Sequence, residues 1–301
     1  MIFPVSTFLE NLINEDLTVA ARSVSERYRG AQKDKRVSSK TEALAYAAAR
    51  MPATFGAIFK ALSKTLELYG KNIDSVLDIG AGTGAATLAA QELLNAASYT
   101  CLEKETVMKD IGEKLVSAKW EKFDLNVSQI PYRADLVIAA YVLNELPDPI
   151  TEALKLWNAT GGLLLIVDSA LPQTSAFMQK IRQTLTDKGA YLIAPCPHTD
   201  ACNEWCHFAT RIERTRLHRR LKGGEAPFED EKFTFLAFSK TPVPNNSARI
   251  LRHPQISSGK VGLTLCTQKG IQTRLITKKN KELYKKARKA KTGDTFPDVE
   301  N

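Results

Sequence analysis

The stretch Ser75-Val-Leu-Asp-Ile-Gly-Ala-Gly-Thr-Gly84 decides the fold. An apolar run ends in a Gly-x-Gly-x-Gly turn, and the helical run Ala85–Asn95 follows it. A strand, a glycine turn and a helix in this order form the first βα unit of a doubly wound sheet. The glycines let the backbone turn tightly and let a ligand approach it closely. A glycine turn without a ligand is the plainer alternative.

The next expected strand, Ser98–Glu103, ends in an acid. An acid at this position can accept hydrogen bonds from both hydroxyls of a ribose. Asp78, near the end of the first strand, is placed to accept hydrogen bonds from the loop or from a cationic ligand group. The glycine loop resembles the S-adenosylmethionine (SAM) loop of class I methyltransferases, whose ligand has no pyrophosphate. We therefore expect SAM to contact five residues, Asp78, Gly80, Gly82, Gly84 and Glu103.

Strands and helices continue to alternate after Glu103. Asp135–Ala140 and Leu163–Val167 are expected strands, the second preceded by a turn at Gly161-Gly162, and Ser175–Lys188 is an expected helix. Four strands separated by helical stretches predict a parallel α/β sheet, here a Rossmann-like methyltransferase sheet. Residues 5–29 and 40–69 predict helices that precede this sheet; Pro52 opens an amphipathic helix there.

The loop after the strand 135–140 carries the catalytic candidates. Ligands of open α/β sheets lie beyond the carboxyl ends of the strands, so Asn144 and Glu145 should face the methyl-donor site. The Asn/Asp-Pro-Pro-Tyr/Phe loop that aligns an exocyclic amine is absent from the sequence, and so is a cysteine pair typical of RNA 5-methylcytosine enzymes. The sequence thus supports SAM binding better than any particular methyl transfer.

Three of the five cysteines fall within eleven residues, Cys196, Cys202 and Cys206. Such clustering on a proline-containing loop favours a metal site over isolated core thiols. The spacing is irregular for zinc, whereas iron–sulfur clusters tolerate irregular spacing and often take one distant thiolate. Cys266 is the distant candidate, and His198 and His207 keep a Cys/His zinc site as an alternative.

Charge is distributed unevenly along the 301 residues. Residues 1–190 hold 21 Lys and Arg against 22 Asp and Glu, and residues 191–301 hold 21 against 11. Between Lys240 and Lys291 fourteen basic residues face one acid, Glu282. A solvated surface normally mixes both signs, so the C-terminal half predicts a phosphate-binding surface, with nucleic acid as the expected partner. A basic tail without a partner is the alternative.

The expected RNA contacts lie on two segments. Asn203–Leu221 predicts a helix whose arginines spread over several faces, and Lys278–Lys291 predicts a tail that is ordered only on a partner. Between them, Lys232–Phe238 predicts a strand, and Val261–Cys266 with Ile271–Ile276 predicts a hairpin. The expected RNA-binding residues are Arg211, Arg214, Arg216, Arg219, Arg220, Lys278, Lys279, Lys285 and Lys286.

No run of about 18 apolar residues exists, so no membrane span is expected. The start, Met1–Leu17, carries three acids and no arginine, unlike a transit or signal peptide. Clustered cysteines without a signal indicate a reducing compartment. We expect a cytoplasmic protein that acts as a monomer.

Three blocks together resemble one family: Val76–Gly84, Ala194–Phe208 continuing through Arg211–Phe228, and the Cys266 strand with its basic tail. They are similar to the methyltransferase-like assembly factors of the mitochondrial small ribosomal subunit and their bacterial relatives. The likeness runs from about Tyr46 to the hairpin. Within this family the acidic N-terminus departs from an organellar precursor, so we expect a bacterial cytoplasmic member, with the mitochondrial matrix less favoured. Its most specific part is Arg216-Leu-His-Arg-Arg-Leu-Lys-Gly-Gly-Glu-x-Pro-Phe-Glu-Asp-Glu-Lys232.

The resemblance implies a 4Fe–4S cluster held by Cys196, Cys202, Cys206 and Cys266, with Cys101 left as a core residue. It also implies contact with the 16S-type rRNA of the assembling small subunit. An active rRNA methyltransferase is the alternative function, and a zinc-stabilised nucleic-acid-binding module a weaker one. The expected domains are a helical region 1–70, a SAM-binding core 71–190, a cluster and RNA-binding region 191–277 with the last sheet strands, and a basic tail 278–301.

Overall fold

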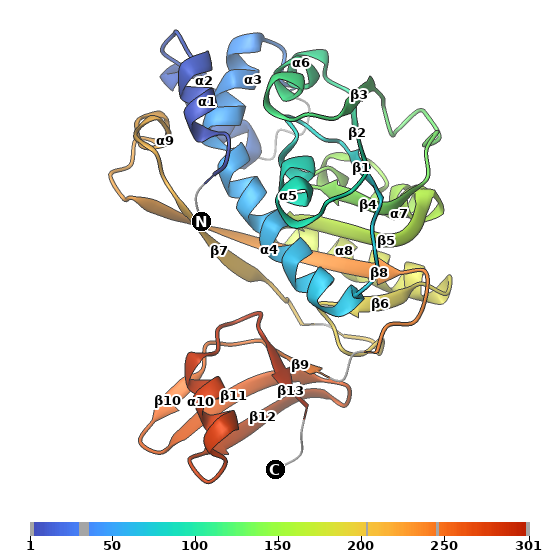
Figure 1. Cartoon of the computed structure of the whole chain (residues 1–301), viewed down its shortest axis with the longest axis vertical. Coiled ribbons are helices and arrows are strands. Elements are labelled where there is room, and N and C mark those ends of the chain that lie inside the picture. Colours follow the sequence, from blue (N-terminus) through green and yellow to red (C-terminus); the bar gives the residue numbers. More distant parts are fainter. Residues whose placement is uncertain (1–2, 30–35, 203, 245–246, 299–301) are drawn as a thin grey trace.

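The computed structural model describes residues 3–29, 36–202, 204–244 and 247–298. Within these residues the strands form a large mixed sheet, flanked by helices, and a smaller antiparallel sheet near the C-terminus (Figure 1). The large sheet has the order β3-β2-β1-β4-β5-β8-β6, with β7 paired to β8. Its strands are β1 (Ser75–Ile79), β2 (Ser98–Glu103), β3 (Lys119–Lys122), β4 (Ala134–Ala140), β5 (Thr160–Ser169), β6 (Tyr191–Ala194), β7 (Phe208–Glu213) and β8 (Phe228–Ser239).

The predicted parallel α/β sheet is confirmed. β1 pairs in parallel with both β2 and β4, and β4 pairs in parallel with β5. The carboxyl ends of these four strands therefore meet at one edge. β8 runs antiparallel between β5 and β6. The short strands β3 and β6 were not expected, because four residues are too few to show a clear periodicity.

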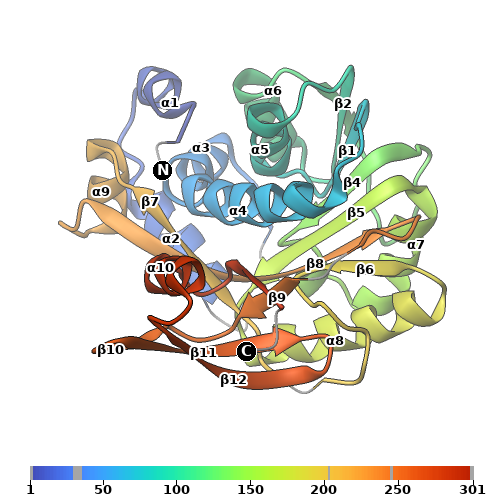
Figure 2. The same cartoon turned by 60° about the horizontal axis from the view of Figure 1, so that its bottom comes forward.

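Helices cover both faces of the large sheet. On one face lie α4 (Met51–Tyr69), α5 (Ala85–Leu93) and α6 (Thr106–Leu115), and on the other lie α7 (Pro149–Ala159) and α8 (Pro172–Asp187). Figure 2 shows α4 and α8 on opposite faces. Alternate strand residues belong to the two hydrophobic cores: Val76 packs in the core beneath α4, α5 and α6, and Leu77 packs in the core beneath α7 and α8.

The N-terminal region is helical, as predicted, with α1 (Ser6–Leu12), α2 (Thr18–Arg29), α3 (Lys40–Ala49) and α4 (Met51–Tyr69). Pro52 stands in the first turn of α4, where its missing N–H costs nothing. The apolar stripe of α4, which includes Phe55, Ile58 and Leu62, is buried against the sheet. No helix within the described residues is long and apolar enough to cross a membrane.

The prediction of a turn at Gly161-Gly162 was wrong, because both glycines lie inside β5. Close packing explains why glycine stands at these two positions. A Cβ on Gly162 would lie 2.5 Å from the Tyr69 hydroxyl oxygen, and one on Gly161 would lie 3.0 Å from the Ala134 carbonyl oxygen. The pair lets β5 pass close to the end of α4 and to the start of β4.

The predicted helix Asn203–Leu221 was also wrong. Residue 203 lies outside the described residues, and Phe208–Glu213 is the strand β7, paired antiparallel with β8. Phe208, Thr210 and Ile212 are buried at a period of two, as in a strand. Phe208 and Ile212 alone, four residues apart, also fit the apolar stripe of a helix. Only α9 (Arg216–Lys222) is helical; it contacts α2 and α3 beyond the end of the sheet.

The second sheet contains β9 (Ser247–Ile250), β10 (Gln255–Ser257), β11 (Lys260–Thr267), β12 (Gly270–Thr277) and β13 (Thr295–Pro297). The predicted hairpin is confirmed as β11 and β12. The prediction that the tail is ordered only on a partner was wrong. The tail contains α10 (Lys281–Lys289), which packs on β11 and β12 through Leu283, Tyr284 and the buried Ala287. Residues 299–301 lie outside the described residues.

Candidate functional site

The glycine loop and the acid at the end of β2 lie together, as the sequence predicted. Glu103 is 7% exposed, and its two carboxylate oxygens accept backbone hydrogen bonds, Oε2 from Gly82 N at 2.6 Å and Oε1 from Glu105 N at 2.8 Å. Burial raises the pKa of Glu103, although these N–H donors oppose the rise. Each oxygen keeps a lone pair for a further donor, so the carboxylate can still accept ligand hydroxyls.

Asp78 holds the start of α5. Its Oδ2 accepts hydrogen bonds from Thr87 N at 3.0 Å and Thr87 Oγ1 at 2.9 Å, and burial raises its pKa to about 7. Gly80 and Gly84 have φ values of +69° and +90°, and a Cβ on either would come within 2.8 Å of Val142 or Val116. These two glycines are therefore explained by backbone conformation and packing alone.

A small cavity lies behind the glycine loop. Its volume is about 20 Å³, room for about one water. Asp78 and the loop form one side, and α3 and α4 form the other through Tyr46, Thr54 and Ile58. Burial raises the pKa of Tyr46 to about 12. The sequence placed α3 and α4 before the sheet but gave no sign that they close this side of the loop.

Asn144 and Glu145 lie in a short 3₁₀ turn at the carboxyl edge, as expected. Asn144 Nδ2 donates to Asp168 Oδ1 at 2.5 Å, whereas Asp168 Oδ2 is buried without a hydrogen-bond partner in the described part of the chain. Burial raises the pKa of Asp168 to about 6. The Glu145 side chain is exposed, unlike that of Asp168. The surrounding protein nevertheless removes water from its carboxyl, and this desolvation, with the charges of Glu103 and Asp168, raises its pKa to about 7.

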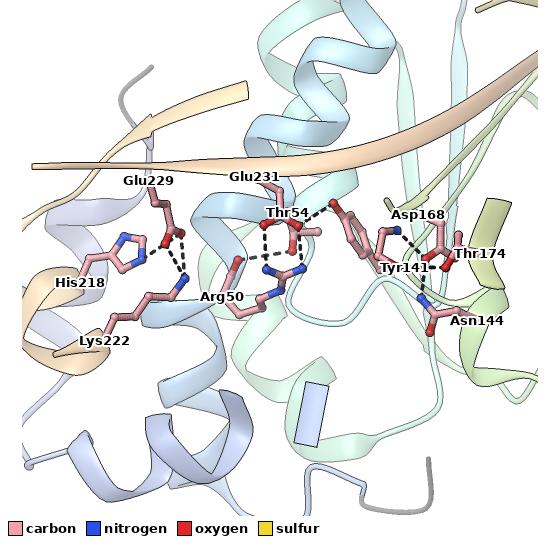
Figure 3. A network of polar contacts seen from close by, with 11 residues as sticks. Arg50, Thr54, Tyr141, Asn144, Asp168, Thr174, His218, Lys222, Glu229 and Glu231 are labelled. Atoms are coloured by element: carbon pink, nitrogen blue, oxygen red, sulfur yellow. Dashed lines mark hydrogen bonds and ion pairs between the residues drawn. The ribbon is translucent and has the colours of Figure 1, made fainter. Parts of the chain in front are cut away.

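A second polar network closes the same edge (Figure 3). Arg50, between α3 and α4, donates to both oxygens of Glu231 on β8, at 3.0 and 2.8 Å. Tyr141 Oη donates to Glu231 Oε1 at 3.0 Å, and Tyr141 has a positive φ of 57° directly after β4. Arg50, Tyr141, Asp168 and Glu231 were not predicted site residues. Asp168 had a usable signal, its place at the end of a strand, but the Arg50–Glu231 pair spans 181 positions.

Three of the predicted metal ligands, Cys196, Cys202 and Cys206, lie half-buried on the loop between β6 and β7, and Cys266 is buried in β11. Burial raises the pKa of Cys206, and the charges of the other three thiolates raise it further. Burial likewise raises the pKa of Cys266 to about 12, helped by Cys196 and Cys202. Arg249, the register partner of Cys266, donates to the carbonyl of Pro195 beside Cys196, so the start of the loop and β11 lie close together.

The loop also shows donors that suit thiolates. Glu204 N donates to Cys202 Sγ at 3.4 Å. However, no group of three or more His, Cys, Asp or Glu side chains in the described ranges is arranged to hold a metal ion. His198 Nδ1 is buried without a partner there, and the ring of His207 packs on Trp205. Cys101 lies apart in the core, beside Thr87 Oγ1 at 3.1 Å, as predicted.

The predicted RNA-binding arginines divide into two groups. Arg211 makes two hydrogen bonds to Asp230, at 2.7 and 2.8 Å, and Arg214 Nη2 donates to Glu229 at 2.6 Å. Glu229 also accepts two hydrogen bonds from Lys222. The other three arginines, Arg216, Arg219 and Arg220, line a groove of about 470 Å³ with Gly223, Gly224 and Glu225, and none forms an ion pair with a described residue.

The predicted lysines lie at and beside α10. Lys278 and Lys279 precede the helix, and Lys285 and Lys286 are exposed on it, Lys286 with its ammonium 5.9 Å from the centre of the Phe296 ring. Lys281, Lys285 and Arg288 recur at helical spacing and form one exposed basic face.

Comparison with known families decides the relationship. The family model described as mitochondrial small ribosomal subunit Rsm22 matches residues 40–297. The chain belongs to the Rsm22 family. The match begins with α3 and runs into β13, so it includes the glycine loop, all four clustered cysteines, α9 and α10. The description connects this Rsm22-family chain to the small ribosomal subunit.

No curated protein matches the chain. Among solved structures, a SAM-dependent methyltransferase from Aquifex aeolicus shares 13% identity at a TM-score of 0.43, covering 67% of this chain and 99% of that one. The magnesium protoporphyrin IX methyltransferase of Synechocystis PCC 6803, solved with SAM, shares 14% at 0.43, covering 79% and 98%. The plantazolicin methyltransferase BpumL shares 13% at 0.45, covering 78% and 100%.

Proposed function

We propose that this Rsm22-family protein binds SAM and the rRNA of the small ribosomal subunit and assists assembly or translation by that subunit. The family match over residues 40–297 carries the proposal, because one matched segment contains the glycine loop, the cysteines and the unpaired arginines. The protein acts as a monomer in this proposal. A bacterial cytoplasmic location stays a prediction.

The SAM part of the proposal is supported by the loop geometry. Glu103 is held by two backbone N–H groups and would accept the ribose hydroxyls. Asp78 would orient the aminoacyl end while it fixes the first turn of α5. The cavity behind the loop has room for about one water, so seating the aminoacyl end there requires the residues that line it to move apart. When bound, SAM would supply an electrophilic methyl group.

The four cysteines supply an all-thiolate donor set, although no group of three or more described side chains is arranged around a metal ion. The loop between β6 and β7 carries three of them and β11 carries the fourth, and β6 and β7 belong to a different sheet from β11. We propose a 4Fe–4S cluster, with zinc as the alternative occupant. Either would tie the second sheet to the loop. Anaerobic purification should give a brown protein with about four irons and four sulfides per chain. One tightly bound zinc without sulfide would replace the cluster by a zinc site.

The unpaired arginines support the RNA part. Arg216, Arg219 and Arg220 form no ion pair within the described ranges, although Glu225 lines their groove and the charge of Arg220 acts on Asp16. The binding constant for small-subunit rRNA should fall with salt, and replacing all three arginines by Gln should make the slope of log K against log salt less negative by about 2. Each lost phosphate contact reduces the steepness of that slope by about 0.7–0.9. Arg211→Gln is the matched control, because its guanidinium is already paired with Asp230. Equal slopes in wild type and the triple variant would place the RNA surface elsewhere.

A second candidate is an active rRNA methyltransferase. Glu145 favours it, because a carboxyl with a pKa of about 7 at the carboxyl edge can accept a proton near neutral pH. Asn144 would help to orient the acceptor beside it. Incubating small subunits with the protein and isotopically labelled SAM tests this candidate. Methyl incorporation that is lost in Glu145→Gln would support it, and absence of incorporation would leave the assembly role.

A further inference from the structure

Two buried arginines flank the cysteine loop. Arg182 lies on α8 and is 5% exposed, and Arg249 lies on β9 and is 3% exposed. Arg249 is the register partner of Cys266 across the β9–β11 ladder. The two side chains therefore come from different elements, a helix and a strand, and both reach the start of the cysteine loop.

Neither guanidinium has a carboxylate at ion-pair distance among the described residues. Arg182 Nη2 donates to the His198 carbonyl oxygen at 2.7 Å, and its buried Nε has no partner there. Arg249 Nε donates to the Pro195 carbonyl oxygen at 3.1 Å, and Nη1 donates to that of Gly293 at 2.8 Å. Carbonyl oxygens satisfy hydrogen bonds but leave the two positive charges without a counter-ion.

Other arginines of the chain show the usual solution. Arg50, Arg214 and Arg252 each have a carboxylate partner, Glu231, Glu229 and Glu204 in turn. A buried charge without a partner is strongly unfavourable. The position of Arg182 and Arg249 thus indicates an anion that belongs beside them.

The cysteine sulfurs are placed to be that anion. Arg249 lies opposite Cys266 on the same face of the β9–β11 ladder, and it donates to the carbonyl of Pro195, directly before Cys196. Arg182 donates to the carbonyl of His198, two residues after Cys196. Four thiolates around Zn²⁺, or around a 4Fe–4S core of charge 2+, carry a net charge of two negatives, which two guanidinium groups would balance.

We propose that Arg182 and Arg249 are positioning residues that neutralise the four-thiolate metal centre and hold its loop in place. The inference rests on the proposed centre. It divides the work of the loop: the cysteines supply the ligands, and the two arginines supply the positive charge that makes burial of an anionic centre favourable.

The test compares Arg182→Gln and Arg249→Gln with the charge-preserving Lys variants. Arg252→Gln is the matched control, because Arg252 also touches the loop, through Glu204, but is already paired. Iron, sulfide and zinc are measured per chain, with the rate of metal loss to a chelator. The midpoint potential is measured where a cluster is present. Thermal unfolding is followed with and without metal.

Each Gln variant should lose metal to the chelator at least tenfold faster, and the Lys variants should restore most of the retention. Removing a positive charge disfavours the reduced cluster, so the midpoint potential of the Gln variants should become more negative. A tenfold change in the one-electron equilibrium corresponds to a shift of about 59 mV. In the metal-free chain the Gln variants should unfold no earlier than wild type, because they remove a buried charge that has no counter-ion.

Equal loss of stability with and without metal would overturn the inference, since the arginines would then act only through their carbonyl hydrogen bonds. Unchanged metal retention and potential in both Gln variants would overturn it as well. Failure of the proposed function is separate and visible in wild type, which would then contain neither iron nor zinc.

Discussion

Glu103→Ala should weaken binding of S-adenosylhomocysteine, the demethylated product of SAM, without unfolding the sheet. Glu103 is the buried acid whose two oxygens already hold the glycine loop, through Gly82 N and Glu105 N. Losing hydrogen bonds from ribose hydroxyls to a charged acceptor costs about 1.5–3 kcal/mol. That corresponds to roughly a 10- to 150-fold rise in Kd. Isothermal titration calorimetry with the product avoids any complication from methyl transfer.

Glu105→Ala is the matched control, because Glu105 lies two residues away and its carboxylate faces Arg36 at 3.6 Å instead of the loop. Thermal unfolding of both variants checks that the core is intact. The raised pKa of Glu103 also predicts a pH dependence. Its carboxyl takes up a proton at a higher pH than an ordinary Glu, so the affinity for S-adenosylhomocysteine should fall as the pH is lowered through that pKa. Equal Kd values for Glu103→Ala and wild type would refute a ribose contact at Glu103.

Three further predictions concern the structure around the site. Glu231→Gln leaves the partly buried Arg50 without its counter-ion, so it should lower the free energy of unfolding by about 2–3 kcal/mol, somewhat less than for a fully buried pair. The neighbouring Asp230→Asn should change that free energy little, because its partner Arg211 is exposed. Equal effects of the two variants in denaturant titrations would contradict this. The pKa of Asp168 is raised to about 6, so this group should make the free energy of unfolding fall by roughly 3 kcal/mol as pH rises from about 4 to 6; unfolding of Asp168→Asn should lack that part of the pH dependence. Cys266→Ser should increase hydrogen exchange after Pro195 and reduce bound metal, whereas Cys101→Ser should retain the metal; intact metal in Cys266→Ser would remove Cys266 from the ligand set.

The parallel core was predictable because its signals are local. The strand at 75–79, the glycine turn and the helix after it follow one another in sequence, and the acid at 103 ends the next strand. Parallel strands bring such carboxyl ends to one edge by geometry alone. The site residues that came from this rule, Glu103, Asn144 and Glu145, lie where the rule places them.

The parts that were missed depend on distant partners. Phe208–Glu213 became a strand because β8 lies beside it, and the bare sequence of six residues allowed a helical stripe as well. The charge of Arg211 and Arg214 gave no sign of Asp230 and Glu229 across that ladder. The tail has a preformed helix because β11 and β12 offer an apolar surface for Leu283 and Ala287. Contacts between residues far apart in sequence decided each of these cases.

We propose that this Rsm22-family chain binds the small ribosomal subunit through its basic half. Co-sedimentation of the anaerobically purified protein with isolated small and large subunits tests it most directly. We predict binding to the small subunit alone, weakened by added salt and by replacement of Arg216, Arg219 and Arg220 with Gln. Equal binding to both subunits, or no binding to the small subunit at low salt, would contradict the claim.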